Sequence, residues 1–114
     1  MTTHPSPTLF AVPPERVAEL VWDDLPAGRH VAMKVLYRTE GASAGLLRMQ
    51  PGARELTHQH VSGEHHLWVL SGKLRVDDTD LPAGSYVHVP AHLTHSVVDA
   101  GSGSTAFFVF CPAE

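Results

Sequence analysis

The 114-residue sequence has little of what marks several large classes of protein. Its single cysteine, Cys111, cannot form an internal disulfide and fits a reducing compartment. Its formal net charge of −4 argues against nucleic acid as a partner, because phosphate binding needs a basic surface. No apolar run approaches the roughly 18 residues of a membrane span, and the first residues do not resemble a signal peptide. We therefore expect a cytoplasmic protein with neither nucleic acid nor a membrane as its partner.

The pattern along the chain predicts one small β-domain. Residues 1–8 contain two prolines and should form a flexible arm, followed by a single domain over residues 9–114. Residues 13–21 fit either a helical turn opened by Pro14 or an extended segment. Short β-rich segments separated by Gly/Pro turns follow, at 31–37, 44–49, 65–70, 73–76, 86–89, 94–98 and 105–111. Residues 71–72 should be a hairpin turn and 77–80 a polar loop, and the whole pattern is typical of an antiparallel sandwich or barrel.

Histidine is abundant, and seven of the nine histidines lie between His58 and His95. In an extended strand His58 and His60 share one face, roughly 6.5 Å apart, so both can reach one ion. Neutral imidazole is the commonest metal ligand. A His-x-His pair alone is weak support, but His95 lies on a separate expected strand beyond a turn at Pro90 and supplies a further ligand.

The spacing of these residues resembles the first signature motif of the cupin superfamily. Gly52, His58, His60 and Gly72 occupy the positions of the motif's glycines and histidines. His65 stands where the motif has glutamate. The resemblance implies an all-β, double-stranded β-helix or jelly-roll barrel.

The second cupin motif is similar to the segment from Gly84 onward. Gly84, Pro90 and His95 stand at their expected positions. His92 replaces the usual glycine and Asp99 the usual asparagine. A histidine tolerates left-handed backbone geometry better than most residues. His92 is therefore either a residue near the mouth of the site or a plain loop residue.

The resemblance implies a metal site with His58, His60 and His95 as ligands. The fourth ligand would be His65, as in cupins that have four histidines. The resemblance implies one divalent transition metal, and imidazole suits iron, manganese, zinc, copper and nickel without selecting among them.

Glu64 is the alternative fourth ligand, because the motif tolerates a gap shorter by one residue. Strand alternation favours His65. If His65 points into the barrel with Leu67 and Val69, then Glu64 points away from it.

Several other side chains have less specific roles. His66 and His88 are expected to be surface or interface residues, and Cys111 a packing thiol. The interior should be lined by Leu47 and Met49, together with either Phe108 and Phe110 or Phe107 and Val109. If His65 faces inward, His66, Trp68 and Leu70 face outward, and this apolar outer face predicts a homodimer.

Three classes of function fit such a site. The first is a metal-dependent oxygenase acting on a small dicarbonyl or phenolic substrate. The second is a non-redox Lewis-acid enzyme, for instance an isomerase or a polyketide-type cyclase. The third is a metal-dependent small-molecule binding or sensing module, because residues 34–36 and 45–52 loosely resemble the cupin domain of zinc-dependent anti-sigma factors as well as small ring-cleaving dioxygenases. We expect an oxygenase in preference to the other two.

Overall fold

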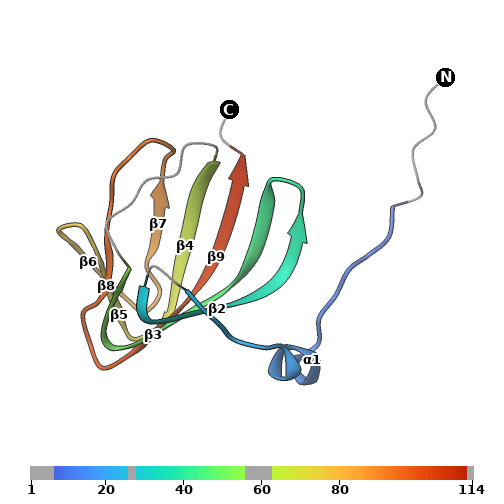
Figure 1. Ribbon diagram of the computed structural model, residues 1–114, viewed down its shortest axis with the longest axis horizontal. Helices are drawn as coiled ribbons and strands as arrows, with labels where there is room; N and C mark the ends of the chain where they lie inside the picture. The colour runs from blue at the N-terminus through green and yellow to red at the C-terminus, as the bar shows by residue number, and fades with distance from the viewer. Residues whose placement is uncertain (1–6, 26–27, 56–62, 113–114) are drawn as a thin grey trace.

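The computed structural model describes residues 7–25, 28–55 and 63–112, which form nine strands and one short helix (Figure 1). His58 and His60 lie outside the described residues, as do residues 1–6 of the expected arm. Within the described ranges, no helix is long and apolar enough to cross a membrane. The elements in chain order are α1 (Pro14–Glu19), β1 (Asp23–Asp24), β2 (Gly28–Thr39), β3 (Ala42–Glu55), β4 (Gly63–Ser71), β5 (Lys73–Val76), β6 (Thr79–Pro82), β7 (Tyr86–Val89), β8 (Val97–Asp99) and β9 (Ser104–Pro112).

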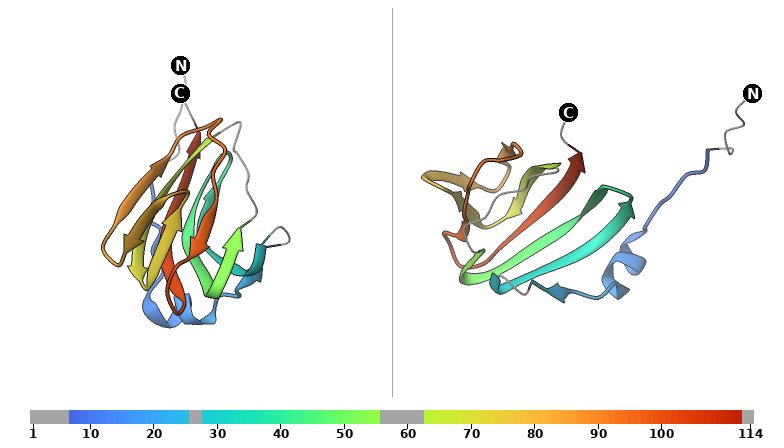
Figure 2. Two further views of the ribbon diagram at one scale, coloured as in Figure 1. Left: turned by 90° about the vertical axis from the view of Figure 1, so that its left-hand side faces the viewer. Right: turned by 45° about the horizontal axis from the view of Figure 1, so that its top comes forward.

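The strands form one antiparallel sheet, which the long strand β3 bends into two halves (Figures 1 and 2). In one half, β3 pairs with β2 and β9, and the order continues through β4 to β7. Beyond the bend, Arg54 of β3 pairs with Val98 of β8, and β8 pairs with β5, which pairs with β6. The result is a nearly closed antiparallel barrel of the jelly-roll type. The fold class predicted from the sequence is therefore confirmed.

Two local predictions in the middle of the chain are wrong. Residues 71–72 do not connect a hairpin, because β4 pairs with β7 and β9 whereas β5 pairs with β6 and β8. The chain instead passes there from one half of the sheet to the other. Gly72 has φ +77°, and an added Cβ would lie 2.1 Å from the carbonyl oxygen of Gly103, so only glycine fits. The expected polar loop at 77–80 contains the start of β6, an edge strand in which Pro82 is tolerated.

The ambiguous segment before the barrel is helical, with Pro14 in the first turn of α1. None of the residues of this short helix is buried, and a side chain of β2 connects the helix to the barrel. Lys34 donates a hydrogen bond of 2.7 Å from Nζ to the carbonyl oxygen of Val17. The Trp22 ring lies 4.8 Å from the same ammonium group and 4.2 Å from the guanidinium of Arg48. These cation–π contacts cover the outer face of β2 and β3.

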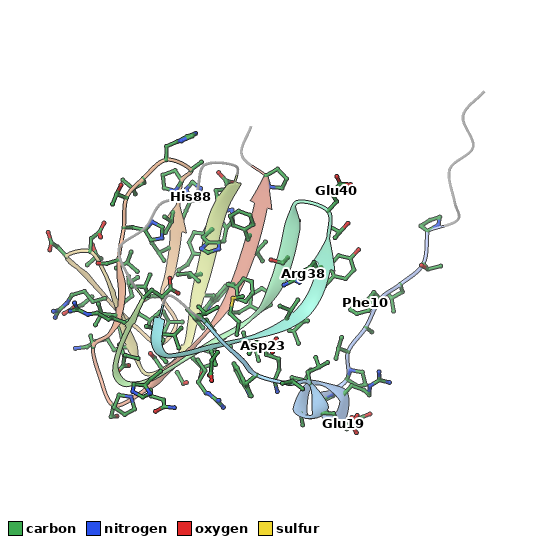
Figure 3. All side chains as sticks on the ribbon, in the orientation of Figure 1. Phe10, Glu19, Asp23, Arg38, Glu40 and His88 are labelled. Carbon is green, nitrogen blue, oxygen red and sulfur yellow. The ribbon has the colours of Figure 1, made fainter. Side chains whose placement is uncertain are left out.

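Residues 7–13 form no strand and run away from the barrel (Figures 2 and 3). Leu9 is 92% exposed, and the ring of Phe10 contacts Tyr37 of β2 at a centroid distance of 5.1 Å.

The core is apolar and lies between the two halves of the sheet. The register decides which face of β9 is inside: Phe108 is opposite Leu67 and Phe110 is opposite His65 on β4. Phe108 and Phe110 therefore face inward, and the alternative with Phe107 and Val109 inside does not hold. The buried cluster consists of Val31, Leu47, Met49, Ala53, Leu67, Val69, Leu74, Val76, Val89, Val97, Ala106 and Phe108.

A buried carboxylate joins the two halves of the sheet where β3 bends. Asp99, at the end of β8, is 4% exposed. Its Oδ2 accepts hydrogen bonds from the backbone N–H groups of Gly52 (3.0 Å) and Gly103 (3.2 Å), and its Oδ1 accepts one from the Ser104 hydroxyl (2.9 Å). Burial acts to raise the pKa of Asp99, but these hydrogen bonds and one from the backbone of Gly101 outweigh it and hold the pKa below the usual value.

Replacing Asp99 with Asn should destabilise the fold, because an amide cannot accept at both oxygen positions. We expect a loss of about 1 to 3 kcal/mol in the free energy of unfolding at pH 7, the usual cost of leaving donors of a charged hydrogen-bond group unpaired. Urea denaturation of the two proteins measures the difference. Asp78→Asn, in the exposed turn before β6, is the matched control and should change stability by less than about 0.5 kcal/mol.

The same substitution predicts a pH dependence. Because the folded pKa of Asp99 is lowered, its contribution to stability is fully present above the unfolded value of about 3.9 and is lost as the pH falls through the folded pKa. The stability difference between wild type and Asp99→Asn should therefore be constant from pH 5 to 8 and shrink below about pH 4. A difference that is independent of pH down to the acid transition would contradict this role of the carboxylate.

Candidate metal centre

Strand β4 presents two different faces, and both carry possible metal ligands. It lies between β7 and β9, with His65 opposite Val89 on one side and Phe110 on the other. The inward positions of β4 are Gly63, His65, Leu67 and Val69, and the outward positions are Glu64, His66, Trp68 and Leu70. Successive residues alternate between the faces along the whole strand.

His65 points into the apolar interior. Its ring lies 5.0 Å from that of Phe110, edge to face, and 6.3 Å from that of Phe108. Gly63 makes room for this packing, since an added Cβ would lie 2.4 Å from Cζ of Phe110. The two phenylalanine rings thus pack against the imidazole on the β9 side.

His95 is held in one orientation just before β8. It is 1% exposed, and its Nδ1 lies 2.9 Å from the backbone carbonyl oxygen of Leu93. A carbonyl oxygen only accepts, so Nδ1 carries the proton and donates it. In a neutral imidazole the lone pair is then on Nε2, which is the arrangement that metal-ligating histidines have in proteins.

The other predicted site residues have simpler positions. Leu47 and Met49 are buried core residues, at 4% and 1% exposure. His92 is an exposed turn residue with φ +67°, the left-handed geometry that glycine would adopt there. His58 and His60 lie outside the described residues, so the four-histidine ligand set stays a prediction, of which the structure describes His65 and His95.

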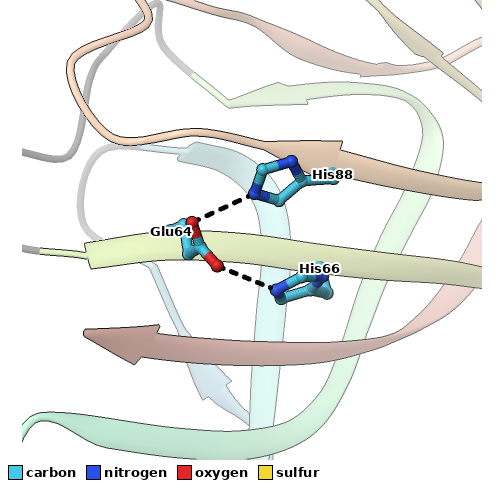
Figure 4. A group of neighbouring side chains, drawn as sticks. All are labelled: Glu64, His66 and His88. Atoms are coloured by element: carbon cyan, nitrogen blue, oxygen red, sulfur yellow. Dashed lines mark hydrogen bonds and ion pairs between the residues drawn. The ribbon is translucent and has the colours of Figure 1, made fainter. Parts of the chain in front are cut away.

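A second group of side chains lies on the outer face, over β4 and β7 (Figure 4). Glu64 and His66 are two residues apart on β4, and His88 is opposite His66 on β7. The Nε2 atoms of His66 and His88 lie 3.3 Å and 3.1 Å from the two carboxylate oxygens of Glu64. One ligand atom from each residue falls within 4.8 Å of the other two, so the group has the geometry to hold a metal ion.

The electrostatics of this outer group keep Glu64 ionised. The hydrogen bond from His88 is the main cause that lowers the pKa of Glu64, partial burial opposes it, and the hydrogen bond from His66 lowers the pKa further. His66 is oriented by the Tyr86 hydroxyl, which lies within hydrogen-bonding distance of Nδ1. The rings of His66 and His88 stack, with centroids 4.9 Å apart.

The sequence pattern did not predict this outer group. His66 and His88 were expected to be separate surface or interface histidines, and Glu64 was expected only as a rival ligand for the inner site. The alternation of β4 places Glu64 and His66 on one face and would have paired them. The third member, His88, becomes their neighbour only through the register between β4 and β7.

Known structures resemble this chain over most of its length. KdgF from Halomonas sp. has a TM-score of 0.71 at 22% identity, covering 85% of this chain and 90% of that one. The polyketide cyclase RemF from Streptomyces resistomycificus has a TM-score of 0.72 at 17% identity, covering 86% and 77%. SigE in complex with the anti-sigma ChrR from Rhodobacter sphaeroides has a TM-score of 0.69 at 23% identity, covering 84% and 50%.

At these identities the similarity establishes the fold and leaves the activity open. No curated protein sequence matches the chain. The family comparison is more specific, because the model for the ChrR cupin-like domain matches residues 15–113. This protein therefore belongs to the ChrR cupin-like family of the cupins.

Proposed function

We propose that this protein is a metal-dependent oxygenase. His58, His60, His65 and His95 would hold one divalent transition metal inside the barrel, and the substrate would be a small β-dicarbonyl or phenolic compound. When bound, the metal would supply a positive centre that favours the ionised form of such a substrate.

The orientation of His95 is the observation that carries the proposal. The Leu93 carbonyl accepts from Nδ1, and this bond leaves Nε2 in the form that can ligate a cation. His65 fits the same role, because its inward position brings an imidazole next to the apolar rings of Phe108 and Phe110.

The surrounding residues favour a substrate that ionises by itself. Among the described residues, the inward positions of β4, β7 and β9 carry no lysine, aspartate or glutamate. No side-chain base from these strands is therefore available to take a proton from the substrate. Phe108 and Phe110 would instead exclude water and pack against the apolar part of a small molecule.

The charge of the ligand set points to an anion. Four neutral imidazoles leave a divalent ion with its full charge of two, whereas a glutamate in place of His65 would reduce it by one. An enolate or phenolate would compensate this charge directly. In a dioxygenase reaction the substrate supplies all four electrons that reduce O2, and both oxygen atoms enter the products, so no further reductant is required.

A Lewis-acid enzyme is the second candidate. A neutral ligand set stabilises the trivalent state of a redox metal less than a carboxylate would, which favours chemistry without a change of oxidation state. The similarity of fold to the polyketide cyclase RemF is compatible with this candidate.

The ligand assignment predicts that the affinity of the tightest metal site depends on His65 and does not depend on Glu64. With one equivalent of metal per chain, His65→Ala should weaken binding by roughly 100-fold or more, because even residues that only orient ligands contribute 10- to 100-fold. Glu64→Ala, whose side chain is on the outer face, should bind this equivalent nearly as the wild type does. Calorimetric titration of the apo protein measures both, and equal losses would refute the assignment.

The choice of reaction can be tested by reconstitution. Apo protein is loaded separately with iron(II), manganese(II), nickel(II), copper(II) and zinc(II), and oxygen uptake is followed with a panel of β-diketones and phenols. We expect uptake only with a redox-active metal and a loss of at least about 100-fold in rate in His95→Ala. Product formation with zinc and no oxygen consumption would favour the Lewis-acid enzyme. Metal-dependent binding without turnover of any compound would favour a sensing module.

The outer face predicts self-association. Trp68, Leu70 and Tyr86 are 55%, 51% and 55% exposed. Phe107 of β9 lies opposite Trp68 of β4. A sheet face facing water would carry polar residues at these positions. We therefore propose that a second copy of the chain covers them and expect a homodimer by light scattering at micromolar concentration. Trp68→Glu should give a folded monomer, whereas a monomeric wild type would contradict the proposal.

A further inference from the structure

We propose that Glu64, His66 and His88 form a second divalent-metal site on the outer face of the barrel, suited to zinc. This site is distinct from the predicted inner one and shares no ligand with it. Both sites use β4, but from opposite faces, because Glu64 and His66 flank His65 in the sequence. The inference does not depend on the proposed function.

The distances between the ligand atoms suit a small tetrahedral ion. Zinc binds imidazole nitrogen and carboxylate oxygen at about 2.0 to 2.2 Å, which places neighbouring ligand atoms about 3.3 to 3.5 Å apart. The observed separations from Glu64 oxygens are 3.3 Å for Nε2 of His66 and 3.1 Å for Nε2 of His88. These distances run to the two different oxygens of Glu64, and all three ligand atoms lie within 4.8 Å of one another, so rotation of the side chains can bring them around one ion.

Neighbouring contacts already orient the imidazoles. Tyr86 lies two residues before His88 on β7, opposite Trp68, and its hydroxyl reaches Nδ1 of His66. With Nδ1 so engaged, Nε2 of His66 faces Glu64. This is the pattern of a ligating histidine whose other nitrogen is held by an outer partner. His66 stacks on His88, and the Nε2 atoms of both rings approach the same carboxylate.

Charge and exposure set the character of the site. Two neutral imidazoles and one carboxylate leave a divalent ion with a net charge of one, and this mixed nitrogen and oxygen set suits zinc better than magnesium or calcium. The side chains of His66 and Glu64 are 31% and 28% exposed and that of His88 is 41% exposed. In the single chain water can therefore complete the coordination, and we expect weaker binding here than at a buried four-histidine site.

The test is a zinc titration of the full-length apo protein by calorimetry, with bound zinc counted by mass spectrometry. Wild type should take up a second, weaker equivalent of zinc per chain. His88→Ala and Glu64→Gln should lose this second equivalent, with affinity lower by at least about 10-fold, and keep the first. Tyr86→Phe, which removes only the orienting hydroxyl, should weaken it by about 10-fold.

Two control variants separate this site from the inner one and from zinc bound by unrelated surface histidines. His30→Asn changes an exposed histidine that belongs to neither group and should leave both equivalents unchanged. His95→Ala should impair the inner equivalent and leave the outer one intact, so failure of the inner site does not affect the result. Copper(II) added to the wild type should quench the fluorescence of Trp68, which shares the outer face with His66. In His88→Ala, the part of this quenching that corresponds to the weaker site should be lost.

The alternative is that the three residues form only a hydrogen-bonded carboxylate–imidazole group. In that case His88→Ala and Glu64→Gln each bind as many equivalents of zinc as the wild type, and with the same affinity. This result would overturn the proposal.

Discussion

The register of β4 between β7 and β9 is the constraint on which the functional surfaces depend. With His65 opposite Phe110 and Val89, one face of β4 enters the core and the other faces outward. A slip of one residue would exchange every side chain between the faces. Leu67 and Val69 oppose such a slip because both are buried, at 4% and 1% exposure. The same hydrophobic contacts that stabilise the barrel therefore hold His65 on the inward face of β4.

The carboxylate of Asp99 connects this half of the barrel with the other. It accepts hydrogen bonds from the backbone N–H of Gly52, where β3 bends, and, where β9 begins, from the backbone N–H of Gly103 and the hydroxyl of Ser104. Gly52 has φ +74°, which glycine adopts without strain. The expected ligands His58 and His60 follow this bend in the sequence.

The two groups of ligands offer different electrostatic environments. Of the proposed inner ligands, His65 lies beside the rings of Phe108 and Phe110, where a cation would keep its full charge and attract an anionic partner. The outer group supplies its own carboxylate and is partly exposed, and the hydrogen bonds from His88 and His66 lower the pKa of Glu64. One strand can serve both because alternation separates the two environments by the thickness of the sheet.

The sequence by itself determined the fold class, the approximate places of most strands and the inward direction of His65, because these follow from local alternation and from the glycine and histidine spacing of the two motifs. The strands predicted at 31–37 and 44–49 are parts of the longer β2 and β3. It left open whether Phe108 and Phe110 or Phe107 and Val109 face inward, since a strand that is apolar on both faces has no periodicity to read. The sequence predicted a hairpin at Gly72, where the chain instead passes from one half of the sheet to the other. It also did not place His88 next to Glu64. Tertiary structure decided these points because they depend on which distant strands pair and in what register, and local sequence does not encode that pairing.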